Sequence, residues 1–458
     1  MKERVERDSM GEITVEADKL WGAQTERSRR NFVIGKGQEQ MPMELVSAIA
    51  LIKEAASLAN RELLPEKMTE EKCRAICSVA EEIRASKLNE HFPLVVFQTG
   101  SGTQTNMNVN EVIANKANLD AGKKLLHPND DVNLSQSSND VVPSAIRVSG
   151  AIAIANDLFP ALEEMIAELA RLEKENEGVI KCGRTHFQDA APIAFSQEIS
   201  GWRASIEKDR KLLLTTLPDL SELALGGTAV GTGLNAPGGF DELVAEKVAD
   251  LSGLPFTPAK NKFHALTSLG EIVFTHGALK ALAADLWKIA NDVRFLASGP
   301  RAGLGEISIP ENEPGSSIMP GKVNPTQCEA LSMVALQVMG NDTVITTAAS
   351  QGNFELNVFL PVVALNFLQS IRLLAEAVTS FSEHCLSGLV ANKEKMKENL
   401  EKSLMTVTAL VPFIGYEKAA KIAQLARAEN KTIKEACLML GFMTEEEFDK
   451  AFHPEEMV

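Results

Sequence analysis

Aromatic residues are scarce in this chain. They make up 5% of its 458 residues, whereas 45% of the residues are hydrophobic and 24% are charged. Alanine, leucine, glutamate and lysine are common instead, and these residues favour helices over strands. The composition therefore predicts a mainly α-helical globular protein, and the length predicts two or three folding units.

Cysteines are few and scattered. Of the six, the closest pair is Cys73 and Cys77, which lie four positions apart in a helical pattern without a second pair or a histidine nearby. Zinc and iron–sulfur sites need clustered ligands. We therefore expect no metal site.

Basic clusters and long uninterrupted apolar runs are also missing. The net charge of −16 and the lack of a basic face argue against nucleic-acid and anionic-membrane binding. The charged start of the chain has no apolar signal-peptide core, so we expect a cytoplasmic protein. Polar residues interrupt the apolar stretch 358–378, which predicts a buried helix and no membrane span.

The clearest regular pattern covers residues 269–297. Ser268 and Glu271 fit a capping box at its start, and Ser298-Gly299-Pro300 ends it. Inside it, hydrophobic residues recur in two seven-residue series, which is typical of a helix in a bundle. The series are Ile272, Leu279, Leu286 and Val293, and Leu282, Ile289 and Leu296.

Two further long helices are predicted. One covers residues 151–176, where Pro160 marks either a kink or the true start. The other begins at Asn324-Pro325, an N-cap followed by proline at the first helical position. After about residue 389 the chain becomes highly charged and then forms short amphipathic helices. We expect a mostly helical N-terminal domain (1–136), a central long-helix bundle (137–390) and a small C-terminal helical domain (391–458).

Four polar segments that contain hydroxyl, amide or charged side chains lie between the helical patterns. Bundle proteins place their sites where loops and helix ends meet, so these segments are candidates for one pocket. Hydroxyls at a helix start, together with backbone N–H groups, bind anions, which points to a small organic acid. The segments are 99–110 (TGSGTQTNMNVN), 135–140 (SQSSND), 183–189 (GRTHFQD) and 315–325 (GSSIMPGKVNP).

Each segment also has an ordinary structural interpretation. Ser101 and Thr103 fit a turn and cap, and residues 137–139 fit a cap of the next helix. His186 is either a packed histidine or a proton carrier at neutral pH, for which Glu329 is the candidate partner. Residues 127–130 fit a Pro-Asn-Asp turn. The glycine-rich run 226–233 superficially resembles a dinucleotide loop, but it lacks a βαβ context.

These motifs together resemble those of class II fumarate hydratases in the aspartase/fumarase superfamily. The resemblance extends from the WGAQT segment at 21–25 to GYEKAAKIAQLA near the C-terminus, and Gly321 in MPGKVNP is similar to fumarases, whereas aspartases typically carry alanine there. It implies a fold with a long-helix bundle that assembles into a homotetramer, active sites shared between three subunits, reversible hydration of fumarate to (S)-malate in the tricarboxylic acid cycle, and no cofactor.

The resemblance also implies residue roles. Ser316 would remove the C3 proton of malate, Lys322 and Asn324 would hold a carboxylate, and His186 with Glu329 would handle the water. A second anion site would be formed by His127, Pro128, Asn129 and Asp130. The remaining substrate-binding residues would be Ser101, Gly102, Thr103, Ser137, Ser138, Asn139, Thr185, Ser317 and Val323.

Three alternatives stay open at this point. An aspartate ammonia-lyase would use the same proton abstraction with a different leaving group. A non-catalytic helical scaffold would have lost Ser316, Lys322 or His186, all of which are present. A nicotinamide-dependent oxidoreductase would use the 226–233 run.

Overall fold

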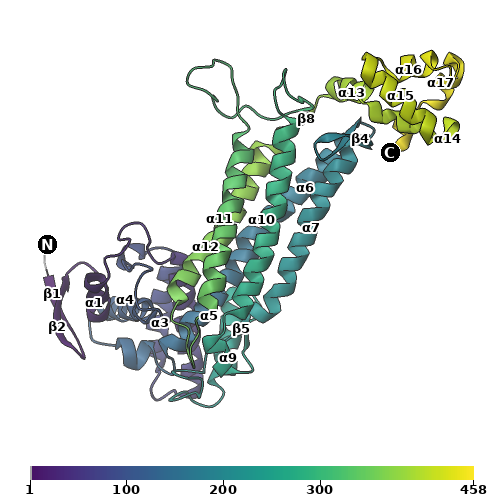
Figure 1. Ribbon diagram of the computed structural model, residues 1–458. Helices are drawn as coiled ribbons and strands as arrows, with labels where there is room; N and C mark the ends of the chain where they lie inside the picture. Colours follow the sequence, from purple (N-terminus) through teal and green to yellow (C-terminus); the bar gives the residue numbers. More distant parts are fainter. Residues whose placement is uncertain (1–2) are drawn as a thin grey trace. The chain divides into compact units, whose positions relative to one another are not determined.

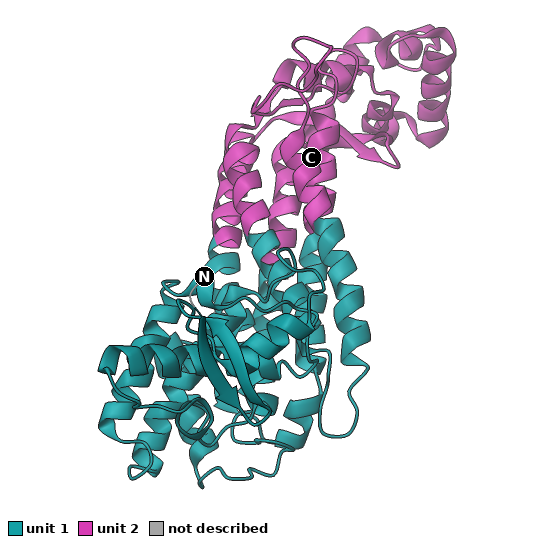
Figure 2. Ribbon diagram, turned by 90° about the vertical axis from the view of Figure 1, so that its left-hand side faces the viewer, with its two compact units in different colours: residues 1–160, 209–283, 335–375 teal, residues 161–208, 284–334, 376–458 magenta. Residues whose placement is uncertain are grey.

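The computed structural model describes residues 3–458 and is mainly helical, as the composition predicts (Figure 1). The chain divides into two compact units (Figure 2). Unit 1 consists of residues 1–160, 209–283 and 335–375, and unit 2 of residues 161–208, 284–334 and 376–458. The predicted three-domain division at 136/137 and 390/391 stays a prediction.

Four long helices contribute residues to both units: α7 (Phe195–Leu220), α10 (Gly270–Leu296), α11 (Thr326–Ala349) and α12 (Leu360–His384). The other elements of unit 1 are β1 (Glu3–Asp8), β2 (Gly11–Glu16), α1 (Ala23–Asn31), α2 (Met43–Leu63), α3 (Glu70–Arg84), η1 (Asn89–His91), α4 (Thr103–Ala121), η2 (Pro128–Val132), α5 (Ser138–Ala153), η3 (Ile154–Leu158), β5 (Glu222–Leu223), α8 (Phe240–Ser252), β6 (Thr257–Pro258) and α9 (Lys262–Thr267).

Unit 2 contains most of α6 (Phe159–Glu175) and the small helices of the C-terminal region. Its remaining elements are β3 (Ile180–Thr185), β4 (Gln188–Ala194), β7 (Ile307–Ser308), η4 (Leu386–Gly388), β8 (Val390–Ala391), α13 (Lys393–Lys402), η5 (Leu404–Leu410), α14 (Val411–Ile414), α15 (Tyr416–Glu429), α16 (Ile433–Met439), α17 (Glu445–Ala451) and η6 (Pro454–Met457).

Helix α10 confirms the predicted heptad helix to within one residue at each end, and every residue of both seven-residue series is buried. The predicted capping box at its start is wrong. Ser268 Oγ accepts a hydrogen bond from the Gly270 N–H at 3.2 Å, and the Glu271 carboxylate instead pairs with Arg147 at 2.9 Å. The buried guanidinium is the stronger partner because a carboxylate neutralises it.

The helix predicted from residue 151 starts earlier, at Ser138, and continues as α5, η3 and α6 to Glu175. Pro160 therefore does not start the helix. It follows the π-helical turn η3, where the wider hydrogen-bonding pattern accommodates a residue that has no N–H. The predicted apolar face is correct, since Leu158, Leu162 and Met165 are fully buried.

Helix α11 begins at Thr326, next to the predicted start. The predicted N-cap role of Asn324 is wrong. Its side-chain amide donates to the Gly315 carbonyl at 2.7 Å and its oxygen accepts from Lys322 Nζ at 2.5 Å, so the side chain closes the preceding loop and leaves the helix N-terminus uncapped by it.

Strands are short, and all of them pair in two-stranded sheets: β1 with β2, β3 with β4 and β7 with β8 antiparallel, and β5 with β6 parallel. Two hairpins were not predicted. Hairpin β1–β2 turns at Ser9 and Met10, and hairpin β3–β4 contains the GRTHFQD segment, which the sequence alone placed in a loop.

A buried polar network ties α10, α11 and α12 together within unit 1. His276 Nδ1 lies 3.0 Å from Asp342 Oδ1, and His276 Nε2 lies 2.8 Å from Ser370 Oγ. Asn341 Nδ2 donates to the same Ser370 oxygen at 3.0 Å. Burial lowers the pKa of His276, although the hydrogen bond to Asp342 opposes this shift. Because the four residues come from three helices, the network fixes the register between the helices.

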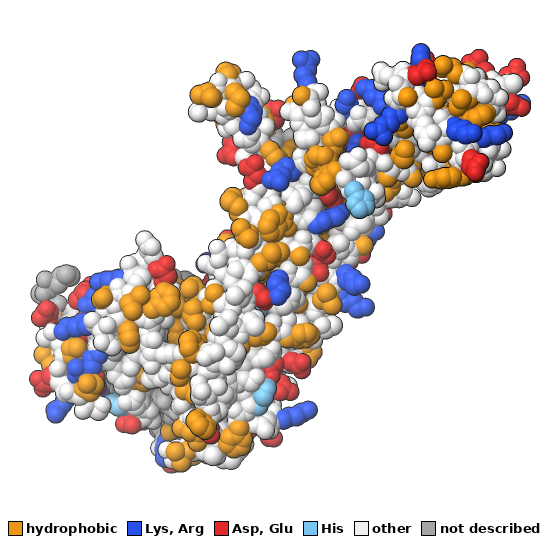
Figure 3. All heavy atoms as spheres, viewed as in Figure 1, with side chains coloured by type: hydrophobic (Ala, Val, Ile, Leu, Met, Phe, Trp, Pro, Cys, Tyr) orange, Lys and Arg blue, Asp and Glu red, His pale blue; other side chains and the backbone are white. Residues whose placement is uncertain are grey.

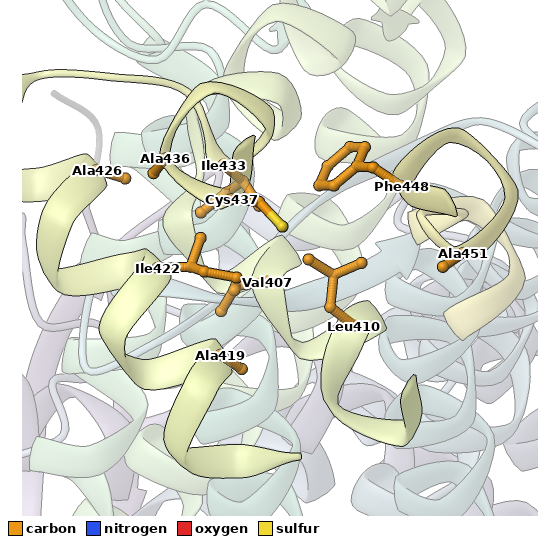
Figure 4. Packing of buried hydrophobic residues seen from close by; sticks show 10 residues of the cluster. All are labelled: Val407, Leu410, Ala419, Ile422, Ala426, Ile433, Ala436, Cys437, Phe448 and Ala451. Atoms are coloured by element: carbon orange, nitrogen blue, oxygen red, sulfur yellow. The ribbon is translucent and has the colours of Figure 1, made fainter. Parts of the chain in front are cut away.

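The C-terminal helices have a hydrophobic core of their own within unit 2 (Figure 4). Leu410, Ile422 and Phe448 point into this core from η5, α15 and α17. Helices α16 and α17 both start with a complete threonine–glutamate capping box, at Thr432–Glu435 and Thr444–Glu447. These local signals match the predicted series of short amphipathic helices after residue 389.

Two helical segments, 138–175 and 360–388, are long and apolar enough to cross a membrane by length and composition alone. The argument that polar residues in 358–378 exclude a span was therefore too strict. In the most apolar window of each segment, 67% and 50% of the residues are buried inside the protein. Core helices of globular proteins pass the same test, so these segments are weak indications of a membrane.

Candidate active site

Two of the predicted segments meet through a chain of hydroxyl groups in unit 1. Ser101 Oγ lies 2.8 Å from Thr103 Oγ1, which lies 2.8 Å from Ser138 Oγ. We call these three residues the hydroxyl cluster. Thr103 begins α4 and Ser138 begins α5, so two helix N-termini are brought to the same place. Helix N-termini carry partial positive charge, and hydroxyls donate hydrogen bonds, which together make an anion-binding site.

Gly102 allows this close approach. Its φ of 70° is left-handed, and a Cβ at this position would lie 2.9 Å from Val142 Cγ1 on α5. A larger residue would push the start of α4 away from α5. The glycine therefore serves the geometry of the hydroxyl cluster.

Ser137 and Asn139 hold the start of α5. Ser137 is the N-cap, and its capping box is completed by Asp140, so the structural interpretation of Ser137 is confirmed. Asn139 Nδ2 donates to the Ala229 carbonyl at 2.8 Å. The run 226–233, which superficially resembled a dinucleotide loop, thus packs against the start of α5.

Asp140 is the residue that joins these two segments, and sequence reasoning missed its role. One carboxylate oxygen accepts from the Ser137 N–H at 2.9 Å, and the other accepts from the N–H groups of Gly226 at 3.1 Å and Thr228 at 2.9 Å. Burial raises the pKa of Asp140 to about 6, and the three N–H donors and the nearby Lys53 cation limit the rise. This single buried carboxylate therefore binds the backbone at the start of α5 and the backbone of the run 226–233.

Lys53 is a second missed residue. It lies fully buried in α2, and its Nζ donates to Asn133 Oδ1 and Gln136 Oε1, both at 2.9 Å. Burial lowers the pKa of Lys53 to about 7, against the attraction of Asp140. No sequence signal separates Lys53 from a surface lysine, because the charged Glu54 follows it directly.

His127 to Asp130 form a local turn at the start of η2. His127 Nδ1 accepts from the Asp130 N–H at 3.2 Å, and the His127 N–H donates to Asp131 Oδ2 at 2.7 Å. Pro128 is the first residue of η2, and Asn129 and Asp130 are exposed. The turn interpretation is thus confirmed, while the second anion site stays a prediction.

Thr185 and His186 lie at the tip of hairpin β3–β4 in unit 2. Thr185 pairs with Gln188, so the turn consists of His186 and Phe187, both with φ of 57°. Two consecutive positive φ values are the mark of a type I′ turn, which fits the twist of a tight hairpin. The turn presents both Thr185 and His186 to the surface. The Phe187 ring contacts Phe295 edge-on, with ring centroids 5.0 Å apart.

Residues Gly315 to Pro325, which we call the donor loop, are closed by their own hydrogen bonds. The Gly315 N–H donates to the Lys322 carbonyl at 2.8 Å, and a Cβ on Gly315 would lie 2.6 Å from that oxygen. Asn324 bridges Gly315 and Lys322, as described above. The two ends of the loop are therefore held together, and only glycine fits at the first of them.

Ser316 is the donor-loop residue with the most defined surroundings. Its Oγ accepts hydrogen bonds from the N–H groups of Ile318 at 3.3 Å and Met319 at 3.0 Å. Two N–H donors favour the ionised form of a hydroxyl. Ser317, Lys322 and Val323 are exposed beside it.

The proposed pairing of His186 with Glu329 is absent within the single chain. Both side chains are exposed, and no hydrogen bond or ion pair joins them in the part of the chain that the structure describes, residues 3–458. Glu329 lies in the first turn of α11. The pairing stays a prediction.

Comparison with known proteins identifies the family. Residues 11–340 match the sequence pattern of a lyase family, and residues 407–458 match that of the fumarase C C-terminus. The chain is 58% identical to a class II fumarate hydratase of Bacillus cereus and 55% identical to one of Bacillus subtilis, and each alignment covers 100% of this chain and 99% of the relative. The chain belongs to the class II fumarate hydratase family.

Solved structures agree with this membership of the class II fumarate hydratase family. A class II fumarase from Schistosoma mansoni superimposes with a TM-score of 0.96 at 42% identity, covering 100% of this chain and 99% of that one. A fumarate lyase/delta crystallin from Brucella melitensis gives a TM-score of 0.93 at 40% identity, with the same coverage. The fold-class prediction is therefore confirmed.

Metal ligands do not cluster in this member of the class II fumarate hydratase family. Among residues 3–458, no group of three or more histidine, cysteine, aspartate or glutamate side chains is placed to hold a metal ion.

Proposed function

We propose that the chain is a fumarate hydratase, a lyase that adds water reversibly to fumarate to give (S)-malate. The observation that carries the proposal is the match to class II fumarate hydratases over the full chain at 58% identity. The hydroxyl cluster and the donor loop support it, because they offer the donors that a small dicarboxylate requires.

The reaction needs strong stabilisation of negative charge. Removing the C3 proton of malate beside a carboxylate gives a dianionic aci-carboxylate, so donors must be in place before the charge develops. Two helix N-termini and the hydroxyls of Ser101, Thr103 and Ser138 suit that task. Gly102, Ser137 and Asn139 hold this arrangement, as their contacts show.

Proton abstraction is assigned to Ser316. A serine hydroxyl is a weak base in water and must lose its proton to act, which two N–H donors favour and the Lys322 cation of the same loop would favour further. Lys322 and Asn324 would then bind a substrate carboxylate, with Ser317, Val323 and Thr185 beside them. His186, paired with Glu329 in the assembled enzyme, would deliver or remove the water. The His127–Asp130 turn would form the second anion site.

Assembly into a homotetramer with sites shared between three subunits is part of the proposal. Helix α11 supports it. In one chain, α11 buries a single narrow seam formed by residues such as Leu331, Ala335 and Val338. The rest of the helix is nearly uncharged, and Met333 and Leu336 are 65% and 58% exposed. Hydrophobic side chains lie at the surface along the long helices (Figure 3). A helix with an exposed apolar face besides its buried seam belongs in a core, here one completed by other copies of the chain.

Leu336→Glu tests the assembly. We expect the variant to sediment as smaller species and to lose activity, because a charge would be buried between subunits. Asp342, which is charged and lies on the same helix, pairs with Lys280 at 2.5 Å in the single chain and shows that α11 has one polar face. Wild-type sedimentation of Leu336→Glu would contradict the placement of α11 at an interface.

The cytoplasm is the proposed location, and no cofactor, nucleic acid or membrane takes part. The nearest rival function is an aspartate ammonia-lyase. Following the absorbance of fumarate with malate and then with aspartate separates them. Turnover of malate alone supports the hydratase, and turnover of aspartate alone contradicts it. No turnover of either substrate would favour a non-catalytic scaffold.

A further inference from the structure

Glu306 is a fully buried carboxylate at a junction of unit 2. It lies between the end of α10 and β7, and its backbone is fixed on both sides. Its N–H donates to the Leu296 carbonyl at 2.9 Å, and its carbonyl accepts from the Asn392 N–H at 2.8 Å. These two hydrogen bonds fix the backbone from which the Glu306 side chain extends.

The two carboxylate oxygens of Glu306 receive a forked contact from Arg184. Arg184 Nη1 donates to Oε2 at 3.0 Å, and Nη2 donates to Oε1 at 2.6 Å. Asn399 Nδ2 on α13 donates to Oε1 at 2.9 Å. A bidentate arginine–carboxylate pair fixes orientation as well as distance, because both partners are planar.

Lys181 adds a second buried cation. Its Nζ lies 3.3 Å from Glu306 Oε2 and 2.9 Å from Glu198 Oε2 on α7. Burial raises the pKa of Glu306, but the Arg184 hydrogen bond and the Lys181 charge outweigh burial and hold the pKa below its usual range. Glu306 thus stays charged at neutral pH and balances two cations of strand β3.

Arg184 directly precedes Thr185, the last residue of β3, and the turn residue His186. The hairpin has an irregular register between Cys182 and Arg184, so its ladder alone leaves this point of the strand weakly defined. The His186 side chain is exposed and makes no side-chain hydrogen bond or ion pair among residues 3–458. Its position therefore depends on the backbone that Arg184 anchors.

We propose that Glu306 is a positioning residue that acts through Arg184 to aim Thr185 and His186 at the substrate. Glu306 touches no reacting atom. Glu306 contacts the hairpin through Arg184, and its own backbone leads through β7 into the donor loop. One buried carboxylate therefore helps to place both the hairpin and the donor loop. The inference rests on the proposed function, since it assigns the hairpin a catalytic task.

The test compares Glu306→Gln with Glu198→Gln in the full-length protein. Glu306→Gln keeps the shape of the side chain but removes the charge that orders Arg184. Because a misplacement of about 1 Å costs roughly 10²-fold, we expect kcat for malate to fall about 10²-fold and KM to change by less than about 10-fold. The pH profile of kcat should also change, because the proton carrier on the hairpin is displaced.

Glu198→Gln is the matched control. Glu198 touches Lys181 in the same network but makes no hydrogen bond to Arg184. We expect wild-type kcat and an unchanged pH profile. Equal losses in both variants would overturn the proposal, because the cause would then be a general disturbance of the buried charges.

Arg184→Lys keeps the test decisive if Glu306→Gln does not fold. Lysine retains the positive charge but loses the fork, so we expect a smaller fall in kcat in the same direction. Hydrogen exchange of residues 180–194 should be faster in Glu306→Gln or Arg184→Lys than in Glu198→Gln. This readout does not need turnover, so it separates failure of the positioning proposal from failure of the proposed function. Folded variants with wild-type kcat, pH profile and exchange would overturn the positioning role.

Discussion

The hydroxyl cluster in unit 1 and the donor loop in unit 2 are held by different physical means. The hydroxyl cluster stands on helices α4 and α5, and buried charges, Asp140 and Lys53, fix the segments around it. The donor loop is largely exposed and is closed by hydrogen bonds among its own residues. The difference fits the proposed roles, in which the cluster is a preformed anion-binding site and the loop supplies the reactive group.

The largest expected effect follows from removing the reactive group. Ser316→Ala should lower kcat by about 10³-fold or more, since a positioned base contributes about 10²–10⁴-fold. The rate of fumarate formation from malate measures the loss. Ser350→Ala is the control, because that hydroxyl is exposed at the end of α11 and bonds the Thr347 carbonyl. Near wild-type rates in Ser316→Ala would reassign the base.

Removing the hydroxyl of Thr103, the central residue of the hydroxyl cluster, should have the next largest effect on the rate. Thr103→Val keeps the shape of the side chain but breaks the contacts to both Ser101 and Ser138. Loss of one such donor typically costs about 10²–10³-fold in rate, and we expect about 10²-fold in kcat/KM for malate. Thr215→Val, an exposed threonine of α7, should leave kcat/KM unchanged. An unchanged kcat/KM in Thr103→Val would remove the cluster from the substrate site.

Asp140→Asn weakens the hydrogen bonds that hold the segments around the hydroxyl cluster but leaves the three hydroxyls in place. An asparagine cannot accept from all three N–H groups, because one of its positions becomes a donor that faces another donor. An unsatisfied buried donor costs about 1–3 kcal/mol, so the free energy of unfolding should fall by that amount and kcat/KM by about 10-fold. Asp120→Asn is the control, since Asp120 is exposed and pairs only with Lys116. Unchanged stability of Asp140→Asn would show that these contacts are dispensable.

Lys53→Met should change how the free energy of unfolding depends on pH. The pKa of Lys53 in the folded protein, about 7, lies below its ordinary value of 10.5. Between these values the unfolded chain binds one more proton than the folded chain, so stability rises with pH by about 1.4 kcal/mol per pH unit from this group.

Denaturant titration at several pH values and at one fixed protein concentration measures this slope. The wild-type protein should gain stability relative to Lys53→Met as pH rises from about 7 towards 10. Lys288→Met, on the exposed face of α10, is the control and should follow the wild type. Parallel curves for wild type and Lys53→Met would contradict the charge state assigned to the buried lysine.

The sequence predicts the long helices well, but it does not reveal the hairpin and the buried charged residues that hold the candidate site. The heptads of α10 recur from Ile272 to Leu296 and fit only a helix, so the predicted bounds are correct to one residue. The hairpin that carries His186 was missed because its strands are short and its turn, His186-Phe187, lacks the Asn-Gly signal of a type I′ turn. Two predicted helix caps were also wrong. The predicted capping box at Ser268 fails because Glu271 pairs with the buried Arg147, and Asn324 does not cap α11 because its side chain closes the donor loop.

The residues proposed to react and the buried residues that hold their segments differ in the same way. Ser316, Lys322 and His186 are in dense motifs and could be found by their spacing. Asp140, Lys53 and Glu306 are single charges that look like surface residues until their burial is known. A pattern in sequence indicates which groups are candidates for the reaction, whereas burial and hydrogen bonds indicate what holds them.

The most direct test of the central claim is the binding of malate to the inactive Ser316→Ala variant, measured by titration calorimetry. If the hydroxyl cluster is the anion-binding site and Ser316 the base, malate should bind within about 10-fold of the wild-type affinity without turnover, and adding Thr103→Val should weaken binding further. A Ser316→Ala variant that turns over malate at the wild-type rate, or a double variant that binds malate as tightly as Ser316→Ala, would contradict the account.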